Sequence, residues 1–279
     1  MEILIKFIII LIFCYLLLFI EDNIIEITKI EIKSSKIPKE FENYKILQLS
    51  DLHNKFFGKN QNNLIKKVKK LNPNIIVLTG DIFDKEDDKA AFSLITECLK
   101  IAPVYFVEGN HEVYQSNQVE LYFKMLQLGV NIIDNKTIYL EINNKKIAIS
   151  GIALHCYLET NESKDLLLKK MQNLEINDNI FNILLCHRPD FIKIIKDYNI
   201  DLMLSGHTHG GQWIIPFIKR GLYAPNQGIF PKYSNGIYYE NKTMLIVNRG
   251  LGNPAKKLGV PIPRIFNKPE ITLCILKRN

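Results

Sequence analysis

The sequence has few of the residues that mark non-globular or cross-linked proteins. Its 279 residues include 14 Gly, 11 Pro and a single Trp, which excludes collagen-like and low-complexity chains. The five cysteines are an odd number and include no Cys-x-x-Cys pair, which argues against a disulfide framework and a thiolate zinc site. Because 47% of the residues are hydrophobic and 23% are charged, the composition is that of a globular protein with a buried core.

No linker rich in Gly, Ser or Pro divides the chain after residue 40, so we expect one catalytic-sized domain behind a short N-terminal module. We assign residues 1–22 to an anchor, 23–41 to a stalk and 42–279 to the domain. The net charge of +7 would suit an anionic partner such as a membrane surface, nucleic acid or phosphate ester. The densest basic run, residues 66–70, has helical periodicity around it, so it is either the solvated face of a helix or an anion patch.

The first residues differ in kind from the rest. Residues 3–20 are apolar except for Lys6, close to the roughly 20 residues needed to cross a bilayer. No small-x-small cleavage pattern follows, so we predict an uncleaved, single-pass membrane helix; a cleaved signal peptide and a buried core helix are the alternatives. We expect this helix to lie in the cell membrane. The acidic residues Glu21 and Asp22 directly after it favour an extracytoplasmic position for the domain that follows.

The rest of the chain alternates short β-branched runs with amphipathic segments. The runs predict strands at residues 44–50, 75–79, 104–108, 137–142, 145–151, 181–186, 201–205, 236–240, 244–248 and 271–276. Helical periodicity predicts helices near 62–72, 89–100, 117–128, 164–174 and 189–198. Because βαβ units come first and antiparallel pairs later, we expect an α/β fold of two mixed β-sheets packed face to face and flanked by helices.

Polar residues follow five of the predicted strands, where each strand ends. These ends read Ser50-Asp51-Leu52-His53, Gly80-Asp81-Ile82-Phe83-Asp84, Gly109-Asn110-His111-Glu112, Cys186-His187-Arg188 and Gly206-His207-Thr208-His209. Five of the six histidines lie in them. In an α/β sheet the carboxyl ends of strands are where sites assemble, so we expect these side chains to share one site.

Each motif alone has an ordinary structural explanation, such as a cap, a turn or a satisfied polar pair. Their joint occurrence favours a metal site, because carboxylate, amide and imidazole together suit a first-row divalent ion such as Mn²⁺, Fe²⁺ or Zn²⁺ better than Ca²⁺. Residues two apart in an extended segment project to the same side. Asp51 with His53, and His207 with His209, can therefore each converge on one metal cluster.

The motifs Asp-x-His, Gly-Asp-x-x-Asp, Gly-Asn-His-Glu, a separate His and Gly-His-Thr-His, in this order over residues 51–209, resemble those of the binuclear metallophosphoesterases of the calcineurin-like superfamily, whose fold is a four-layer sandwich. Residues 210–212, 248–252 and 269–271 further resemble the membrane-anchored bacterial branch, some of whose members cleave the diphosphate of UDP-2,3-diacylglucosamine. This resemblance covers about residues 42–276.

The resemblance implies two divalent metal ions, with Mn favoured over Fe or Zn. One would be held by Asp51, His53, Asp81 and His209, and the other by Asp81, Asn110, His187 and His207, with Asp81 bridging. Two such ions clamp a phosphoryl group and turn a shared water into hydroxide. His111 would protonate the leaving oxygen or stabilise charge on it, and Asp84 would orient His111.

We therefore predict a membrane-anchored hydrolase of phosphodiester or diphosphate bonds, with a substrate that could be linked to a lipid. The alternative from another class is a metal-bearing scaffold that binds a partner protein without catalysis. We expect no nucleic acid partner and no obligate protein partner.

Four further features remain open. Arg249 either holds an anionic substrate, because its guanidinium matches phosphate geometry, or has a structural role; Arg188 is expected in a structural salt bridge. His155 is expected in the core or at the rim. Residues 213–239, rich in aromatics, Gly and Pro, form either ordinary packing or a lipid-facing lip beside the site.

Overall fold

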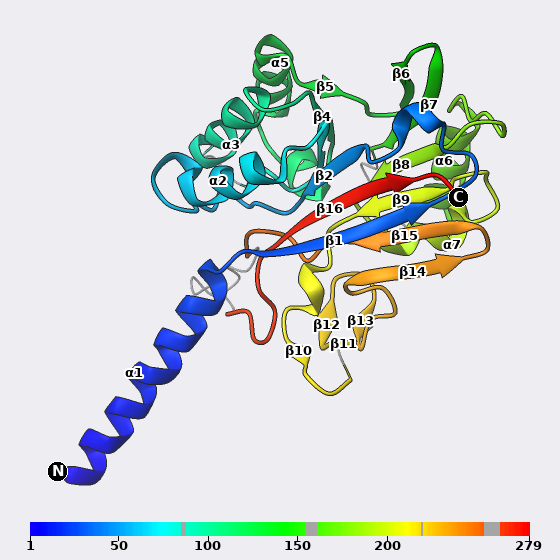
Figure 1. The fold of residues 1–279 in the computed structure, drawn as a ribbon. Helices are drawn as coiled ribbons and strands as arrows, with labels where there is room; N and C mark the ends of the chain where they lie inside the picture. The colour runs from blue at the N-terminus through cyan, green and yellow to red at the C-terminus, as the bar shows by residue number, and fades with distance from the viewer. Residues whose placement is uncertain (85–87, 154–160, 219, 254–262) are drawn as a thin grey trace.

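The computed structural model describes residues 1–84, 88–153, 161–218, 220–253 and 263–279. Two six-stranded sheets make up its centre (Figure 1). The first has the order β1-β16-β2-β3-β4-β5 and the second the order β14-β15-β9-β8-β7-β6. Both are mixed, since each combines parallel with antiparallel neighbours.

The strands of the first sheet are β1 (Glu26–Lys33), β2 (Lys45–Leu49), β3 (Ile75–Thr79), β4 (Val104–Val107), β5 (Asn131–Ile132) and β16 (Glu270–Lys277). Those of the second sheet are β6 (Lys136–Ile142), β7 (Lys145–Ile152), β8 (Asn182–Cys186), β9 (Leu202–Ser205), β14 (Gly236–Glu240) and β15 (Thr243–Val247). All ten predicted strands are confirmed to within two residues at each end. The turns at Asn143-Asn144 and Asn241-Lys242 close the antiparallel pairs β6–β7 and β14–β15.

The helices are α1 (Glu2–Asn23), α2 (Asn62–Leu71), α3 (Lys89–Leu99), α4 (Asn110–Val113), α5 (Gln118–Leu128), α6 (Asn161–Gln172) and α7 (Ile192–Ile195), with short 3-10 turns η1 (Lys39–Phe41), η2 (Lys59–Gln61), η3 (Pro189–Phe191) and η4 (His209–Gly211). The helix predicted near 189–198 is shorter than expected, because the chain forms η3 and then only α7. In α2 the buried positions Leu64, Ile65, Val68 and Leu71 share one face, and the four lysines of the run 66–70 lie outside that face.

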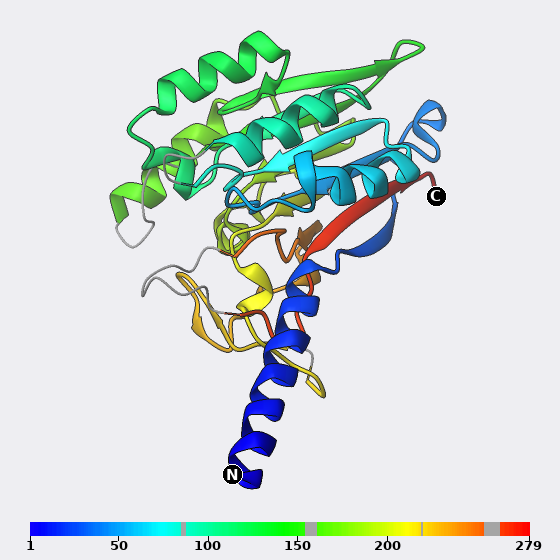
Figure 2. The ribbon, with the colours of Figure 1, turned by 90° about the vertical axis from the view of Figure 1, so that its left-hand side faces the viewer.

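Three hydrophobic clusters separate four layers. One lies between the first sheet and α2, α3 and α5, the second between the two sheets, and the third between the second sheet and α6 and α7. The α/β sandwich predicted from the sequence is thus observed, and Figure 2 shows the helices outside the two sheets.

The N-terminal segment forms α1 and then β1. Within the part of the chain that the structure describes, no helix is both long enough and apolar enough to span a bilayer. Of the predicted stalk, residues 26–33 form β1, which pairs in parallel with β16 along its whole length. This strand alternates exposed and buried side chains at its end, with Ile30 and Ile32 buried, which is the pattern of a strand with one face on a core.

Candidate metal centre

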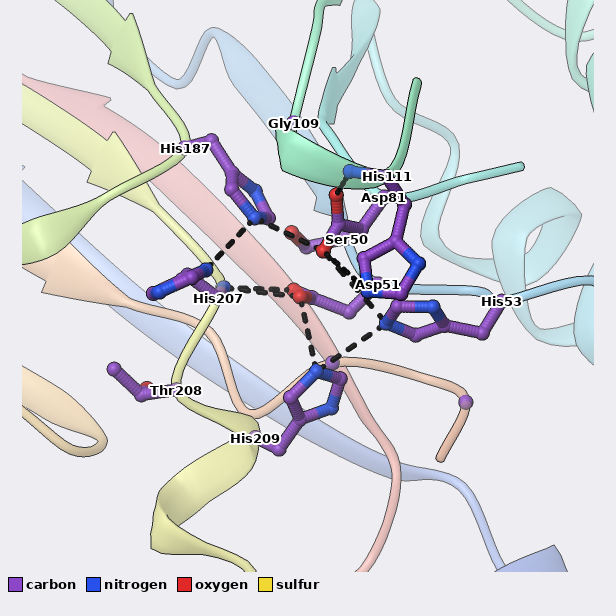
Figure 3. Close-up of polar contacts among 12 residues, drawn as sticks. Ser50, Asp51, His53, Asp81, Gly109, His111, His187, His207, Thr208 and His209 are labelled. Carbon is purple, nitrogen blue, oxygen red and sulfur yellow. Dashed lines mark hydrogen bonds and ion pairs between the residues drawn. The ribbon is translucent and has the colours of Figure 1, made fainter. Parts of the chain in front are cut away.

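Apart from Asn110, which Figure 3 does not label, the predicted ligand residues lie together at one edge of the two sheets (Figure 3). Strands β2, β3 and β4 run parallel, as do β8 and β9, so within each sheet their carboxyl ends meet at the same edge. The side chains come from the residues after these strands: Asp51 and His53 after β2, Asp81 after β3, Asn110 and His111 after β4, His187 after β8, and His207 and His209 after β9.

Asp51, His53 and His209 form the first cluster, in which one possible ligand atom from each lies within 4.8 Å of the others. The Nε2 atom of His209 is 3.3 Å from Nε2 of His53 and 3.4 Å from Oδ1 of Asp51. Asp51 is fully buried and also accepts the backbone N–H of His207. Only glycine fits at position 206, because a Cβ there would lie 2.3 Å from Oδ2 of Asp51.

Asp81, His187 and His207 form the second cluster under the same distance limit. The Nε2 atom of His187 is 3.2 Å from Oδ2 of Asp81 and 3.2 Å from Nδ1 of His207. The same oxygen of Asp81 lies 3.8 Å from Nε2 of His53 in the first cluster. Asp81 therefore stands between the two clusters, where a bridging ligand would stand.

The hydrogen bonds of the two histidines in the second cluster are those expected around a bound cation. His187 donates from Nδ1 to the backbone oxygen of Thr79 at 2.7 Å, and His207 donates from Nε2 to Oδ1 of Asn226 at 2.9 Å. A neutral imidazole carries one proton, so the two ring nitrogens that face each other at 3.2 Å both carry lone pairs. These lone pairs repel unless a proton or a metal ion lies between them. The hydrogen bonds to Thr79 and Asn226, on the far side of each ring, are usual for metal-binding histidines.

Electrostatics support this interpretation. Burial disfavours a charged His187, but the charge and hydrogen bond of Asp81, the charge of Asp51 and the hydrogen bond to Thr79 together raise the pKa of His187 to about 10. A proton therefore takes the cation's place in the metal-free chain. Burial, helped by the charge on His187, lowers the pKa of His207 to about 4. Burial also lowers the pKa of His209 well below its ordinary value. His207 and His209 are thus neutral, as metal ligands must be.

A further buried atom fits a cation. Oδ1 of Asn110 is buried, and no hydrogen-bond donor reaches it among the described residues. An unpartnered buried acceptor is costly, and a metal ion would satisfy it. The carboxylate, amide and imidazole donors together suit a first-row divalent ion.

The backbone at the site is strained. Five of the predicted ligand residues have left-handed φ angles: Asp51 (51°), His53 (48°), Asp81 (53°), His207 (72°) and His209 (48°). Residues other than glycine rarely adopt this region, and such strain concentrates at functional sites. The surrounding fold therefore holds these side chains in positions that their own conformational preferences would not choose.

Glu112 holds the turn that carries Asp81, a role that the sequence motif does not predict. Its fully buried carboxylate accepts the backbone N–H groups of Asp81 (2.9 Å), Ile82 (2.7 Å), Phe83 (3.1 Å) and Gly109 (2.8 Å). Burial and the charge of Asp81 raise the pKa of Glu112, and the backbone donors act in the opposite direction. Its position three residues after Gly109, in the same turn, was the available signal.

His111 lies at the mouth of the site beside Asp84. Its Nδ1 is 3.1 Å from Oδ1 of Asp84, whose Oδ2 is 3.6 Å from Nδ1 of His53. The His111 side chain is 30% exposed, whereas the side chain of His53 is 1% exposed. Burial disfavours a charged His111, but the hydrogen bond to Asp84 and the charge of Asp81 raise the pKa of His111 to about 9.

Arg249 is paired with two carboxylates. Its Nη2 lies 3.2 Å from Oε2 of Glu26 and 3.1 Å from Oε1 of Glu270, and its backbone N–H also donates to Glu270. The guanidinium is thus paired with carboxylates of β1 and β16. Arg188 forms the expected salt bridge, with two hydrogen bonds to Asp190. His155 lies outside the described residues.

Two other polar side chains contact the site histidines. Arg264 is fully buried, with Nη2 3.4 Å from Nδ1 of His209 and Nη1 donating to the backbone oxygen of Arg249. Asn226, which orients His207, follows β12 in the segment predicted as packing or a lip. Neither residue belongs to a motif with fixed spacing, so the sequence carried no local signal for them.

Comparison with known proteins gives consistent results. The family profile described as Calcineurin-like phosphoesterase matches residues 44–211. The metallophosphoesterase YkuE of Bacillus subtilis is 32% identical over 93% of this chain and 88% of its own length. The UDP-2,3-diacylglucosamine pyrophosphatase LpxG of Chlamydia muridarum is 26% identical over 92% of this chain and 90% of its own length.

Some relatives are longer. A metallophosphoesterase of Caenorhabditis elegans, F40B5.2, is 28% identical over 86% of this chain but only 51% of its own length.

Among solved structures, TT1561 of Thermus thermophilus superposes with a TM-score of 0.51 over 75% of this chain and 91% of its own, at 11% identity. That structure shares the fold.

Proposed function

Since the chain belongs to the calcineurin-like phosphoesterase family, whose members are metal-dependent hydrolases, we propose that it hydrolyses a phosphodiester or diphosphate bond with two divalent metal ions. The observation that carries this proposal is the pair of buried clusters with Asp81 between them. Asp51, His53, Asp81 and His209 would hold one ion, and Asp81, Asn110, His187 and His207 the other. When bound, two such ions supply Lewis acidity that polarises the phosphoryl group and acidifies water.

The chain's own residues supply positioning and proton transfer. Thr79 and Asn226 fix the proton positions of His187 and His207, so that the inward nitrogens stay free to bind. His111 is the only one of the site histidines with substantial exposure, so it can reach the leaving group of a substrate at the mouth of the site. The carboxylate of Asp84 holds its Nδ1 proton, which leaves Nε2 to donate a proton to the leaving oxygen.

We propose Mn²⁺ as the native metal and a lipid-linked diphosphate ester as the substrate class. The mixed oxygen and nitrogen donors support a first-row ion. The similarity to LpxG, a pyrophosphatase of a diacylated sugar nucleotide, supports the substrate class. The exposed apolar side chains of α1, among them Ile3, Phe7, Tyr15 and Phe19, support attachment of the domain to a membrane, and we propose an extracytoplasmic orientation.

The decisive test uses the full chain reconstituted with Mn²⁺, Fe²⁺ or Zn²⁺. Metal content is measured by mass spectrometry, and hydrolysis is measured on a phosphomonoester, an aryl phosphodiester, a sugar nucleotide diphosphate and a lipid diphosphate. We expect two metal ions per chain and hydrolysis that stops on chelation and returns with metal. Two bound ions without hydrolysis of any substrate would support the scaffold alternative instead.

Attachment and orientation are tested separately. Cell fractionation should place the full chain with membranes, and protease added outside the intact inner membrane should cleave the domain. Full-length chain in the soluble fraction, or a mature N-terminus beyond residue 20, would overturn the attachment.

A further inference from the structure

A small lobe beside the metal centre exposes an unusual number of large apolar side chains. It comprises residues 213–218 and 220–235, with the two-residue strands β10 (Ile214–Ile215), β11 (Arg220–Gly221), β12 (Tyr223–Ala224) and β13 (Gly228–Ile229), and we call it the β10–β13 lobe. Its exposed side chains are Trp213, Phe217, Ile218, Tyr223, Ile229 and Phe230. Phe217 is 98% exposed and Ile229 is 70% exposed. Exposed apolar groups gathered in one place usually mark a binding surface.

The lobe lies at the same end of the molecule as α1. Figures 1 and 2 show both below the two sheets. A single segment connects them: Glu21 at the end of α1 accepts the backbone N–H of Asn267, while Trp213 donates from its indole to the backbone oxygen of Pro263. A surface that contacts the apolar face of the lobe would therefore also lie near α1.

The charge of the lobe is of one sign. Residues 213–235 contain Lys219, Arg220 and Lys232 but no Asp or Glu. Lys232 forms an ion pair with Glu240 of β14, outside the lobe. Aromatic and aliphatic tips combined with basic residues are typical of segments that lie in the headgroup region of a bilayer. Basic residues near the bilayer are attracted to anionic phospholipids.

We propose that the β10–β13 lobe is a lipid-contact surface that inserts Phe217, Ile218 and Ile229 into the headgroup region of an anionic bilayer. The lobe also reaches the metal centre, because Asn226, between β12 and β13, accepts the hydrogen bond from His207. This inference rests on the proposed function and extends it: a lipid-linked ester would reach the site while its lipid part stays in the bilayer.

The single tryptophan makes this surface directly observable. Trp213, at the base of the lobe, is the chain's only Trp, so its fluorescence reports on the lobe without a label. The full chain is mixed with vesicles of phosphatidylcholine and phosphatidylglycerol at 3:1, with and without brominated acyl chains. We expect a blue shift of the emission and quenching by the brominated lipid.

Substitutions test whether the lobe, and not another exposed apolar surface, contacts the lipid. Phe217→Ser with Ile229→Ser should weaken the quenching, with apparent lipid affinity reduced roughly tenfold for each apolar side chain removed. The matched control is Val119→Ser with Phe123→Ser, two residues that are also exposed. Both belong to α5, a helix at the opposite end of the ribbon from strands β10–β13 in Figure 1. The control should bind vesicles as the unchanged chain does.

Either of two results would overturn the proposal. One is unquenched Trp213 in a chain that sediments with the vesicles, which would leave the lobe in water or against a protein. The other is equal loss of quenching in the lobe variant and the control. Hydrolysis of a soluble aryl phosphodiester should be the same in the lobe variant and the unchanged chain, so a failure of the lipid surface is distinguishable from a failure of the proposed function.

Discussion

Replacing Glu112 with Gln should destabilise the fold and loosen the metal centre. The four backbone N–H groups around Glu112 divide evenly: Ile82 and Phe83 donate to Oε1, and Asp81 and Gly109 donate to Oε2. A glutamine has one oxygen and one NH₂ group in the same places. In either orientation of the amide, two buried N–H groups face another donor.

The magnitude follows from these contacts. A hydrogen bond to a charged acceptor contributes about 1.5–3 kcal/mol, so losing two costs about 3–6 kcal/mol, a large part of a total stability of roughly 5–15 kcal/mol. At about 2–4 °C per kcal/mol for a chain of this size, even the lower figure lowers the Tm by about 6–12 °C. Because the same contacts hold the turn of Asp81, metal affinity should fall about 10- to 100-fold.

Thermal unfolding is monitored by circular dichroism, with metal bound and after chelation. A metal titration measures the affinity. Glu120→Gln is the matched control, because Glu120 is exposed and forms a surface ion pair with Lys124 at 2.8 Å, which is worth at most about 1 kcal/mol. A Tm for Glu112→Gln within about 2 °C of the unchanged chain would refute the reasoning. Burial raises the pKa of Glu112, and such a result would mean that the carboxyl is already neutral, so that Gln mimics it.

Three further outcomes test the catalytic roles. His111→Ala should keep both metal ions and lose about 10²–10⁴-fold in turnover on an alkyl ester, with a much smaller loss on an aryl ester that needs no acid; steady-state kinetics on both esters measure this, and equal losses would argue for charge stabilisation instead. Asp81→Asn should reduce activity and metal content more than Asp51→Asn, because Asp81 would serve both ions, and the reverse order would refute the bridging role. In metal-free protein His111 should titrate near pH 9: since this folded pKa is above the ordinary 6.5, the stabilisation by Asp84 is complete below about pH 6.5 and is lost as the pH rises through 9. Nuclear magnetic resonance of the imidazole protons measures that midpoint, and a value near 6.5 would contradict the prediction.

The sequence predicted the elements that carry strong local patterns. The ten predicted strands are runs of β-branched and apolar residues, buried in β3 at every position, and such runs indicate strands wherever they occur. The ligand residues could be predicted together because each directly follows a strand, and topology then brings strand ends to one edge.

Contacts between distant segments could not be predicted. The role of Arg249 depends on Glu26, which lies in a strand that reads as a stalk because half of its side chains are exposed polar residues. Asn226 and Arg264 meet the site histidines only after folding, from segments with no periodicity. The strands of the β10–β13 lobe have two residues each, too few for any alternation to be recognised.

The position of β16 affects how the chain folds during translation. In the first sheet β16 lies between β1 and β2 and pairs with both, yet Glu270–Lys277 leaves the ribosome long after β2 has been made. Until then one edge of β2 has unpaired backbone groups, and β1 has no neighbour. Open strand edges promote aggregation, so the nascent chain should depend on chaperones throughout synthesis, and a message truncated before codon 270 should give insoluble product even though every predicted metal ligand is present.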